Sequence, residues 1–158
     1  MTDHDLSVRP ATPGDAAAIR DLVLAAYAKW VPLIGREPRP MSADYDASVR
    51  EHEFDLVLEG ERLVGLIEMV LRDDHLWIEN VAVSPSAQGR GIGRQLLARA
   101  EDRARRAGRS ETRLLTNGAF AANISLYERV GYVVTHTEPY LGGVTVYMTK
   151  QLAPPVTA

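Results

Sequence analysis

The chain has 158 residues, of which 46% are hydrophobic and 25% are charged, and its formal net charge is −3. These values are ordinary for a globular domain, and the length suits one domain with its own core. The chain has no cysteine, which excludes disulfides, thiolate metal sites and a covalent cysteine mechanism and fits a reducing compartment. No secretory signal and no membrane-spanning apolar run is visible. We therefore expect a single cytoplasmic domain over residues 1–158, ordered from about residue 6 to residue 152.

Charge is unevenly distributed along the chain. Residues 1–61 carry 12 acids and 6 bases, a net of −6, whereas residues 62–158 carry 9 acids and 12 bases, a net of +3. Most of the excess of basic residues lies along the predicted helix after the glycine-rich segment: Arg99, Arg103, Arg105, Arg106 and Arg109. Cations are favoured near a helix C-terminus, and no aromatic residues are interleaved with these arginines, so we expect no nucleic-acid partner. An acidic first half, if it lines a binding site, favours a cationic ligand.

The pattern of apolar residues predicts the first elements in chain order. Residues 6–9 alternate as a short strand, and residues 12–30 follow helical spacing after an N-cap at Thr12. Residues 31–41 contain three prolines, so they cannot form a regular helix. This segment is either a substrate-gating loop or a plain connector. Ser42 is predicted to cap a second helix that ends near residue 52.

The rest of the chain alternates between strands and helices. The predicted strands are residues 54–59, 62–71, 75–83, 111–116, 132–137 and 144–152. Two more helices are predicted, one beginning near Ile92 and one over residues 119–130 that ends at Gly131. The strand–helix–strand crossover implies one locally parallel pair in an otherwise antiparallel sheet. The sequence therefore predicts an α/β (α+β) fold, with a mixed, mostly antiparallel twisted sheet of about seven strands flanked by four helices.

A glycine-rich loop lies between the strand at residues 75–83 and the helix that follows it. Three glycines fall within five positions, and apolar residues then resume at helical spacing: Ile92, Leu96, Leu97, Ala100 and Ala104. A loop that enters a helix N-terminus presents unpaired N–H groups and the positive end of the helix dipole, and Arg90 and Arg94 add charge. Such a loop suits a phosphate or pyrophosphate. It fits neither the P-loop nor the dinucleotide fingerprint, and the alternative is a connection without a ligand.

Two motifs carry a family resemblance. Gln88-Gly89-Arg90-Gly91-Ile92-Gly93, after a strand that ends Val81-Ala82-Val83, resembles the acetyl-coenzyme A loop of the GNAT N-acetyltransferases. Asn123 and Tyr127 on a predicted helix, followed by Gly131-Tyr132, resemble the family's other cofactor motif. The predicted element order is also that of the GNAT fold, so the resemblance spans about residues 6–150. It implies one GNAT domain that uses acetyl-coenzyme A to acetylate an amine directly, without an acyl-enzyme.

The resemblance also assigns residues to the cofactor. It implies that the pyrophosphate is held by the backbone of the loop: Gln88, Gly89, Arg90, Gly91, Ile92, Gly93 and Arg94. The pantetheine is expected to pair along the strand edge at Val81, Ala82 and Val83, as an added strand would. A backbone N–H near Val81 or Ala82 is expected at the thioester oxygen, where one such donor is worth about 3 kcal/mol. Asn123 either contacts the pantetheine arm or is a surface amide.

The catalytic assignments follow from the same resemblance. Tyr127 matches the family's general acid. A phenol with a pKa of about 10 is protonated at neutral pH, so it can donate a proton to a leaving thiolate. The alternative is that Tyr127 only packs and hydrogen-bonds the cofactor. Glu79 is the predicted general base, because many family members place a glutamate at or near this position. Glu68, among apolar residues on the preceding strand, is its rival, and both could instead pair with arginines or recognise the charge of the amine.

The acceptor side is less specific in the sequence. Trp30 and Tyr140 are candidate substrate contacts, because exposed aromatic residues on loops often serve recognition. The four histidines have no metal-ligand spacing, so no metal is predicted. We expect a primary amine as acceptor, cationic overall, either a small molecule or a peptide or protein amine. The alternatives are a non-catalytic acyl-coenzyme A-binding module and an acyl donor other than acetyl; a homodimer is expected from the family only.

Overall fold

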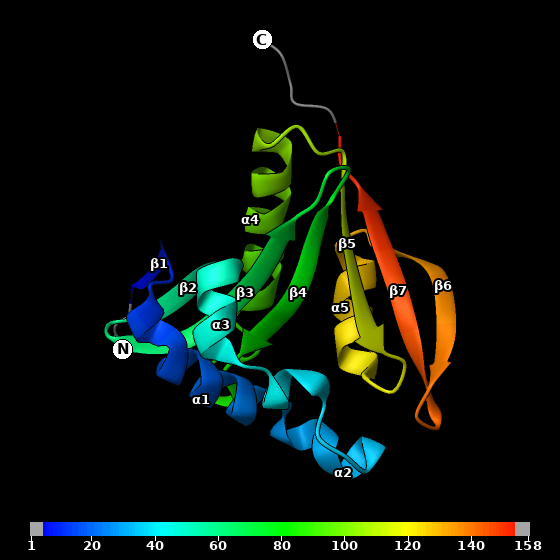
Figure 1. Cartoon of the computed structure of the whole chain (residues 1–158), viewed down its shortest axis with the longest axis horizontal. Coiled ribbons are helices and arrows are strands. Elements are labelled where there is room, and N and C mark those ends of the chain that lie inside the picture. The colour runs from blue at the N-terminus through cyan, green and yellow to red at the C-terminus, as the bar shows by residue number, and fades with distance from the viewer. Residues whose placement is uncertain (1–4, 154–158) are drawn as a thin grey trace. The chain divides into compact units, whose positions relative to one another are not determined.

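The computed structural model describes residues 5–153 (Figure 1). Its strands are β1 (Leu6–Pro10), β2 (Glu53–Glu59), β3 (Arg62–Leu71), β4 (Leu76–Val83), β5 (Glu111–Asn117), β6 (Val133–Tyr140) and β7 (Gly143–Gln151). Its α-helices are α1 (Ala16–Tyr27), α2 (Val31–Ile34), α3 (Tyr45–Glu51), α4 (Ile92–Arg106) and α5 (Ala121–Arg129). The helix α2 is a single turn of four residues, so the four longer helices correspond to those predicted.

The strands form one sheet in the order β1-β2-β3-β4-β5-β7-β6. Neighbouring strands pair antiparallel in β1–β2, β2–β3, β5–β7 and β6–β7, whereas β4 and β5 are parallel. The parallel pair is the one joined through α4, because a crossover helix returns the chain in the same direction. The predicted seven-stranded, mostly antiparallel sheet is therefore confirmed.

The chain divides into two compact units. Among the described residues, the first contains residues 5–69 together with Asn80–Leu96, and the second contains Val70–Glu79 together with residues 97–153. The second half of β4 therefore belongs to the first unit, and the first half of β4 belongs to the second. Each unit has its own buried side chains.

The core of the first unit lies between α1 and its sheet. One face of α1 is buried at helical spacing: Ala16, Ile19, Leu22, Val23 and Ala26. This face packs with Phe54, Leu56, Leu66 and Ala82 from the strands and with Tyr45 from α3. Each fully buried aliphatic side chain of this kind stabilises the folded state by about 1.5–3 kcal/mol. The predicted apolar face of this helix is confirmed, although the α-helix ends at Tyr27 and continues to Trp30 as a 3₁₀ turn.

In the second unit, β5 and β7 bury alternate residues. Thr112, Leu114, Val146 and Met148 are buried on one face, whereas Glu111, Arg113, Leu115 and Tyr147 are half-buried or exposed on the other. Every residue of the edge strand β6 is exposed. The second unit thus has one face packed into its core and one open face.

Two details between α1 and β2 differ from the prediction. Residues 31–41 were predicted to lack regular helix, yet they contain α2, because Pro32 lies in the first turn, where its missing N–H removes no hydrogen bond. The turn ends at Gly35, whose φ of 75° is left-handed. The N-cap of α3 is Asp44, not Ser42, because the Asp44 side chain accepts the N–H of Ala47 at 3.2 Å.

The strand β6 is longer than predicted, since it extends to Tyr140 before the chain turns at Leu141 and Gly142. No helix among residues 5–153 is both long enough and apolar enough to cross a membrane.

Candidate functional site

The glycine loop joins β4 to α4 in the first unit. Gly89 and Gly91 have φ of 82° and 78°, a left-handed conformation that glycine adopts without strain. A Cβ added at either position would meet no atom within 4 Å, so the space above the loop is open. The Gln95 N–H donates to the Gly91 carbonyl at 3.0 Å. The N–H groups of the three residues before it, Ile92, Gly93 and Arg94, have no acceptor within the helix. The loop therefore presents the anion-binding end of a helix, as predicted from its sequence.

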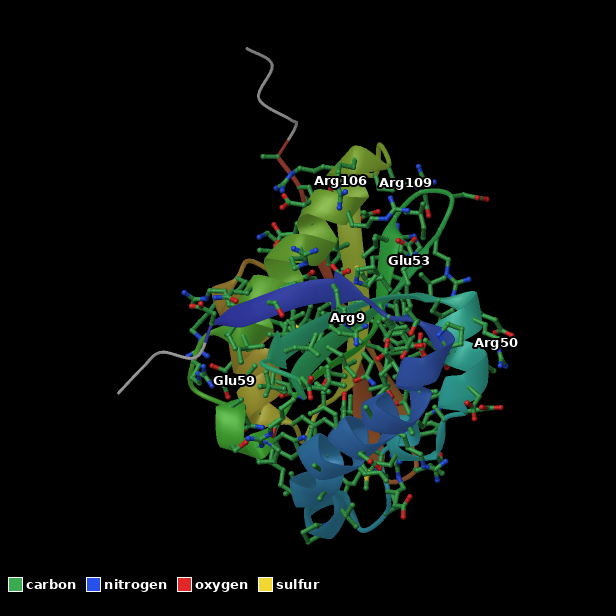
Figure 2. The ribbon with its side chains drawn as sticks, turned by 90° about the vertical axis from the view of Figure 1, so that its left-hand side faces the viewer. Arg9, Arg50, Glu53, Glu59, Arg106 and Arg109 are labelled. Carbon is green, nitrogen blue, oxygen red and sulfur yellow. The ribbon has the colours of Figure 1, made fainter. Side chains whose placement is uncertain are left out.

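The two arginines of the loop differ in their partners. Arg90 forms an ion pair of 2.9 Å with Glu59. Glu59 is the last residue of β2 (Figure 2). Arg94 is exposed on the first turn of α4. The positive potential at the loop therefore comes from the helix dipole and Arg94 rather than from both arginines.

Side chains fasten the loop to its surroundings. The amide of Gln88 donates to the Val83 carbonyl at 3.3 Å and accepts from Lys29 at 3.5 Å. The Arg62 guanidinium donates to the hydroxyl of Ser86 and lies 3.5 Å from that of Ser84. These contacts connect both ends of the loop to β3, to β4 and to the turn that follows α1.

A buried hydrogen-bond network reaches the predicted cofactor edge of β4. Tyr27 donates its hydroxyl proton to Asn80 at 2.7 Å, and the same hydroxyl lies 3.4 Å from the Val81 carbonyl. The Asn80 amide donates to the Tyr45 hydroxyl at 3.3 Å, and Tyr45 donates to the Pro40 carbonyl at 2.7 Å. The network ties α1 and the segment before α3 to the strand that is predicted to hold the pantetheine.

Sequence reasoning missed Asn80, which is buried on the same strand as the predicted cofactor edge. The available signal was its position, since it is a polar residue at a buried place in the apolar run of β4. Buried amides are almost always hydrogen-bonded, so such a residue points to a network.

Glu68 is buried on β3 and is paired with a histidine. Its carboxylate lies 2.6 Å from Nδ1 of His52, which precedes β2. The partner considered from the sequence was an arginine. Glu68 is only 3% exposed, so its carboxylate faces the interior of the first unit rather than open solvent.

In the second unit, Tyr127 lies on α5 with its side chain buried. Its ring packs edge-on against Tyr132, with centroids 6.0 Å apart. Burial raises the pKa of Tyr127 to about 12, because the phenolate would lose its hydration. The phenol is therefore a proton donor throughout the neutral range. Asn123 is half-buried one turn earlier on the same helix, and residues four apart share a helix face.

Glu79 is exposed on β4, and its carboxylate is held by a tryptophan. The indole N–H of Trp77 donates to Glu79 at 2.7 Å. The two residues are two positions apart on a strand, so their side chains leave the same face. In the sequence, the spacing Trp-Ile-Glu is the signal for this contact.

The open face of the second unit contains a cavity of about 790 Å³. Its lining includes Trp77 from β4, Arg113 from β5, Tyr147 and Thr149 from β7 and His136 from β6. The strand register places Trp77 beside Arg113 and Arg113 beside Thr149, so these side chains form its floor.

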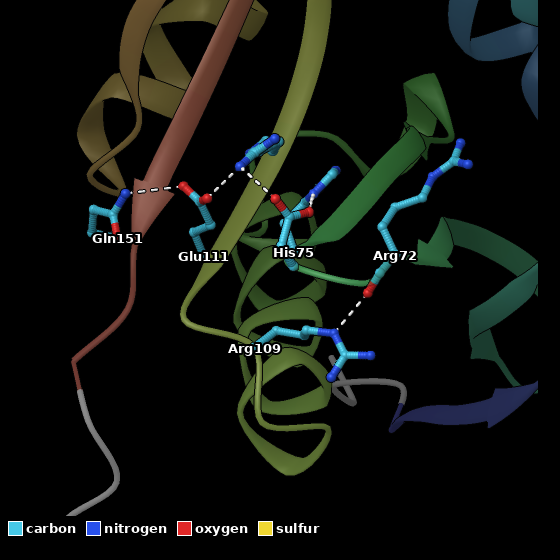
Figure 3. Close-up of polar contacts among 7 residues, drawn as sticks. Arg72, His75, Arg109, Glu111 and Gln151 are labelled. Carbon is cyan, nitrogen blue, oxygen red and sulfur yellow. Dashed lines mark hydrogen bonds and ion pairs between the residues drawn. The ribbon is translucent and has the colours of Figure 1, made fainter.

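A polar network fixes one end of this cavity (Figure 3). Gln151 donates to Glu111 at 2.9 Å, and Glu111 pairs with Arg113 at 2.5 Å. Arg113 also lies 3.6 Å from Asp74, which is 2.6 Å from Nδ1 of His75. The hydrogen bond from His75 lowers the pKa of Asp74, and Arg113 lowers it further. The guanidinium of Arg113 is thus balanced by two carboxylates.

The remaining predicted residues lie at the surface. Trp30 is half-buried, and Nζ of Lys29 lies 4.8 Å from its ring centroid. Tyr140 is exposed at the end of β6. Across the part of the chain that the structure describes, no group of three His, Cys, Asp or Glu side chains is placed to hold a metal ion.

Comparison with known proteins assigns the family. Residues 17–132, well over half of the chain, match the acetyltransferase (GNAT) family. The chain therefore belongs to the GNAT acetyltransferase family, which confirms the resemblance found in the two motifs.

Solved structures show the same fold. A GNAT-family protein from Desulfovibrio desulfuricans has a TM-score of 0.79 at 21% identity, over 94% of this chain and 100% of that one. The PaiA N-acetyltransferase of Thermoplasma acidophilum, in complex with coenzyme A, has a TM-score of 0.76 at 17% identity, over 93% and 99% of the two chains. Both similarities confirm the predicted GNAT fold.

One curated relative is more similar over a shorter stretch. The chain is 40% identical over 63 residues to the L-methionine sulfoximine/L-methionine sulfone acetyltransferase of Salmonella typhimurium. The match covers 40% of this chain and 37% of that protein. It supports the family.

Proposed function

We propose that this protein is an N-acetyltransferase that transfers the acetyl group of acetyl-coenzyme A directly to a primary amine. The observation that carries the proposal is the loop at the start of α4, where left-handed Gly89 and Gly91 leave open space above a helix N-terminus. Membership of the GNAT family and the similarity to a PaiA structure that contains coenzyme A support it.

The residues of the first unit fit an acyl-coenzyme A. The backbone N–H groups from Gln88 to Arg94 would hold the pyrophosphate, because they lie at or just before the N-terminus of α4. The edge of β4 from Val81 to Val83 would pair with the pantetheine amides. The family resemblance also assigns Asn123 to the pantetheine arm. When bound, the co-substrate supplies an activated acetyl thioester.

The proposed proton transfers use two residues of the second unit. Glu79 takes a proton from the ammonium, directly or through water, and the free amine forms a bond to the acetyl carbon. The carbon–sulfur bond breaks, and Tyr127 gives its proton to the departing thiolate. The acetylated nitrogen then loses its second proton, which passes through water to the Tyr127 phenolate and restores the phenol. The raised pKa of Tyr127 keeps this proton in place at neutral pH. The hydrogen bond from Trp77 holds the Glu79 carboxylate in one orientation.

The proposal also covers the acceptor amine, the oligomeric state and the cellular location of the protein. The net charge of −6 in residues 1–61 favours a cationic acceptor. The curated relative acts on methionine sulfoximine and methionine sulfone by its name, which supports a small amine. The absence of cysteine fits a cytoplasmic protein, and a homodimer is proposed by analogy with the family.

The first test is calorimetric titration with acetyl-coenzyme A, followed on the same sample by thiol release with a panel of amines. The chain has no cysteine, so every thiol detected comes from the co-substrate. We expect binding and turnover. Absence of binding contradicts the whole proposal, and binding without turnover on any amine favours a non-catalytic acyl-coenzyme A-binding module. Propionyl-coenzyme A in parallel tests the acyl group.

The second test is Tyr127→Phe, which removes the proposed acid and keeps the ring that packs against Tyr132. Turnover is expected to fall by about 10²–10⁴-fold with donor affinity nearly unchanged. Glu128→Gln is the matched control, because Glu128 is the exposed neighbour of Tyr127 on α5. Equal turnover of Tyr127→Phe and the wild type would remove the acid role.

A further inference from the structure

We infer that the cavity on the open face of the second unit binds the body of the amine acceptor and selects monoamines that carry a flat aromatic ring. This inference rests on the proposed function for the identity of the acceptor, but binding at the cavity can be tested without it. The cavity of about 790 Å³ is within the range of about 300–1,000 Å³ that small-molecule sites occupy.

Aromatic side chains define the cavity. The indole of Trp77 stands on β4, and the rings of His136 and Tyr147 stack on the other side of β5, with centroids 4.1 Å apart and planes 11° from parallel. Aromatic pairs of this kind add about 0.5–1.5 kcal/mol to burial, which corresponds to about two- to twelvefold in affinity. A planar ligand can therefore meet ring surfaces on two sides.

The polar tips of these rings already have partners. The Trp77 N–H donates to Glu79, and the Tyr147 hydroxyl donates to Glu138 at 3.2 Å. Nε2 of His136 also lies 3.6 Å from Glu138. Because the polar tips are occupied, the rings themselves offer a ligand their surfaces rather than new hydrogen bonds.

On the β4 side of the cavity, away from Glu138 on β6, the charges favour one amine over two. Glu79 is an exposed carboxylate beside Trp77, and side chains two positions apart on a strand are separated by about 6.6 Å. An ammonium at Glu79 therefore brings the next atoms of the acceptor over the indole. Further along, Arg72 is an exposed cation in the lining, and Arg113 is already balanced by Glu111 and Asp74. A second ammonium that extends along β4, as in a polyamine, would lie near the positive charge of Arg72.

The test is calorimetric titration of the whole protein with three probe amines, with and without saturating coenzyme A. Phenylethylamine carries the ring, cyclohexylethylamine has the same length without aromaticity, and diaminobutane carries a second ammonium. We expect phenylethylamine to bind about tenfold more tightly than cyclohexylethylamine, and diaminobutane to bind most weakly. Equal affinities of the two ring compounds, tighter binding of diaminobutane, or no binding of phenylethylamine in either arm overturns the inference.

Variants locate the effect. Trp77→Leu should abolish the difference between the two ring compounds, and His136→Leu, at an exposed position on β6, should reduce it severalfold. Val133→Thr is the matched control, because Val133 is exposed on the same strand and is outside the cavity lining. A preference that persists in both Trp77→Leu and His136→Leu contradicts the assigned site, and the second variant retains the test if the first does not fold.

These titrations need no turnover, so they separate the inference from the proposed function. Failure of acetyl-coenzyme A to bind, together with selective binding of phenylethylamine, would remove the proposed function and leave the aromatic-amine site. Binding of acetyl-coenzyme A with turnover only on non-aromatic amines would support the proposed function and remove the aromatic-amine site.

Discussion

Gly65 allows the start of α4 to pack directly on β3, and replacing it with alanine tests how tightly the glycine loop depends on this contact. A Cβ at Gly65 would meet Cγ2 of Ile92 at 2.8 Å and Cδ1 of Leu96 at 3.5 Å. Both side chains are almost fully buried, so neither can move into solvent. Ile92 is the first residue of α4 and a member of the glycine loop motif.

The size of the effect follows from these distances. Carbon atoms in contact prefer about 3.5–4.0 Å, so Ile92 must retreat by about 0.7 Å or more in Gly65→Ala. Overpacking of this kind costs about 1–3 kcal/mol. For a domain of this size, each kcal/mol lowers the melting temperature by about 2–4 °C. The shift also moves the backbone N–H groups of the loop, so affinity for acetyl-coenzyme A should fall together with stability.

Thermal and urea unfolding measure the first effect, and calorimetric titration with acetyl-coenzyme A measures the second. Ile92→Ala removes the clashing methyl and should cost about 2–5 kcal/mol by leaving a cavity. The double variant should cost less than the sum, because the new methyl at position 65 fills part of that cavity. Gly14→Ala is the control, since its Cβ would meet only Oγ1 of Thr12 at 3.8 Å. A Gly65→Ala protein within about 0.5 kcal/mol of the wild type, or strictly additive costs, would refute the reasoning.

Two further predictions concern stability. Tyr132→Phe removes the hydroxyl that lies 2.6 Å from Oγ1 of Thr112 and leaves the buried threonine hydroxyl unpaired, which should lower the free energy of unfolding in urea by about 1–3 kcal/mol. Adding Thr112→Val should recover part of that loss, because it removes the unpaired hydroxyl. No recovery would show that another contact matters. Asp15 accepts two hydrogen bonds from Arg9, which hold the pKa of Asp15 well below its usual range. Because the folded pKa is the lower one, this carboxylate stabilises the fold above about pH 4 and the contribution is lost as the pH falls. Asp15→Asn should therefore lower the melting temperature at pH 7 and approach the wild type in acid, and a gap independent of pH would contradict this account.

Much of the fold could be predicted because its signals are local. The apolar periodicity of α1 and α4 and the glycines around Gly91 each act over a few residues. The strand β3 has the predicted bounds, Arg62–Leu71. The errors arose where two local rules compete. At Pro32 a helix-breaking residue is also a good first-turn residue, and at Ser42 an acceptable cap precedes a better one at Asp44.

The candidate site was less predictable because its partners come from distant parts of the chain. The glycine loop can be read from one continuous stretch. The ion pair of Arg90 with Glu59 and the hydrogen bond of Tyr27 with Asn80 join residues 31 and 53 positions apart. A sequence gives the residue types for such contacts but not which ones meet. The role of Trp77 beside Glu79 was within reach, since strand alternation alone places both on one face.

The hydrogen-bond network through Asn80 also limits which sequence changes this protein can tolerate. Tyr27, Asn80 and Tyr45 come from three separate segments, and each supplies a hydrogen bond to the next. The last contact holds the Pro40 carbonyl, so the segment before α3 is anchored to the strand that carries the proposed cofactor edge. A graft that imports residues 31–44 from a relative must therefore bring compatible residues at positions 27, 45 and 80. Substitutions at these three positions therefore depend on one another. An exposed position within residues 31–44, such as Leu33, can be replaced without affecting the network.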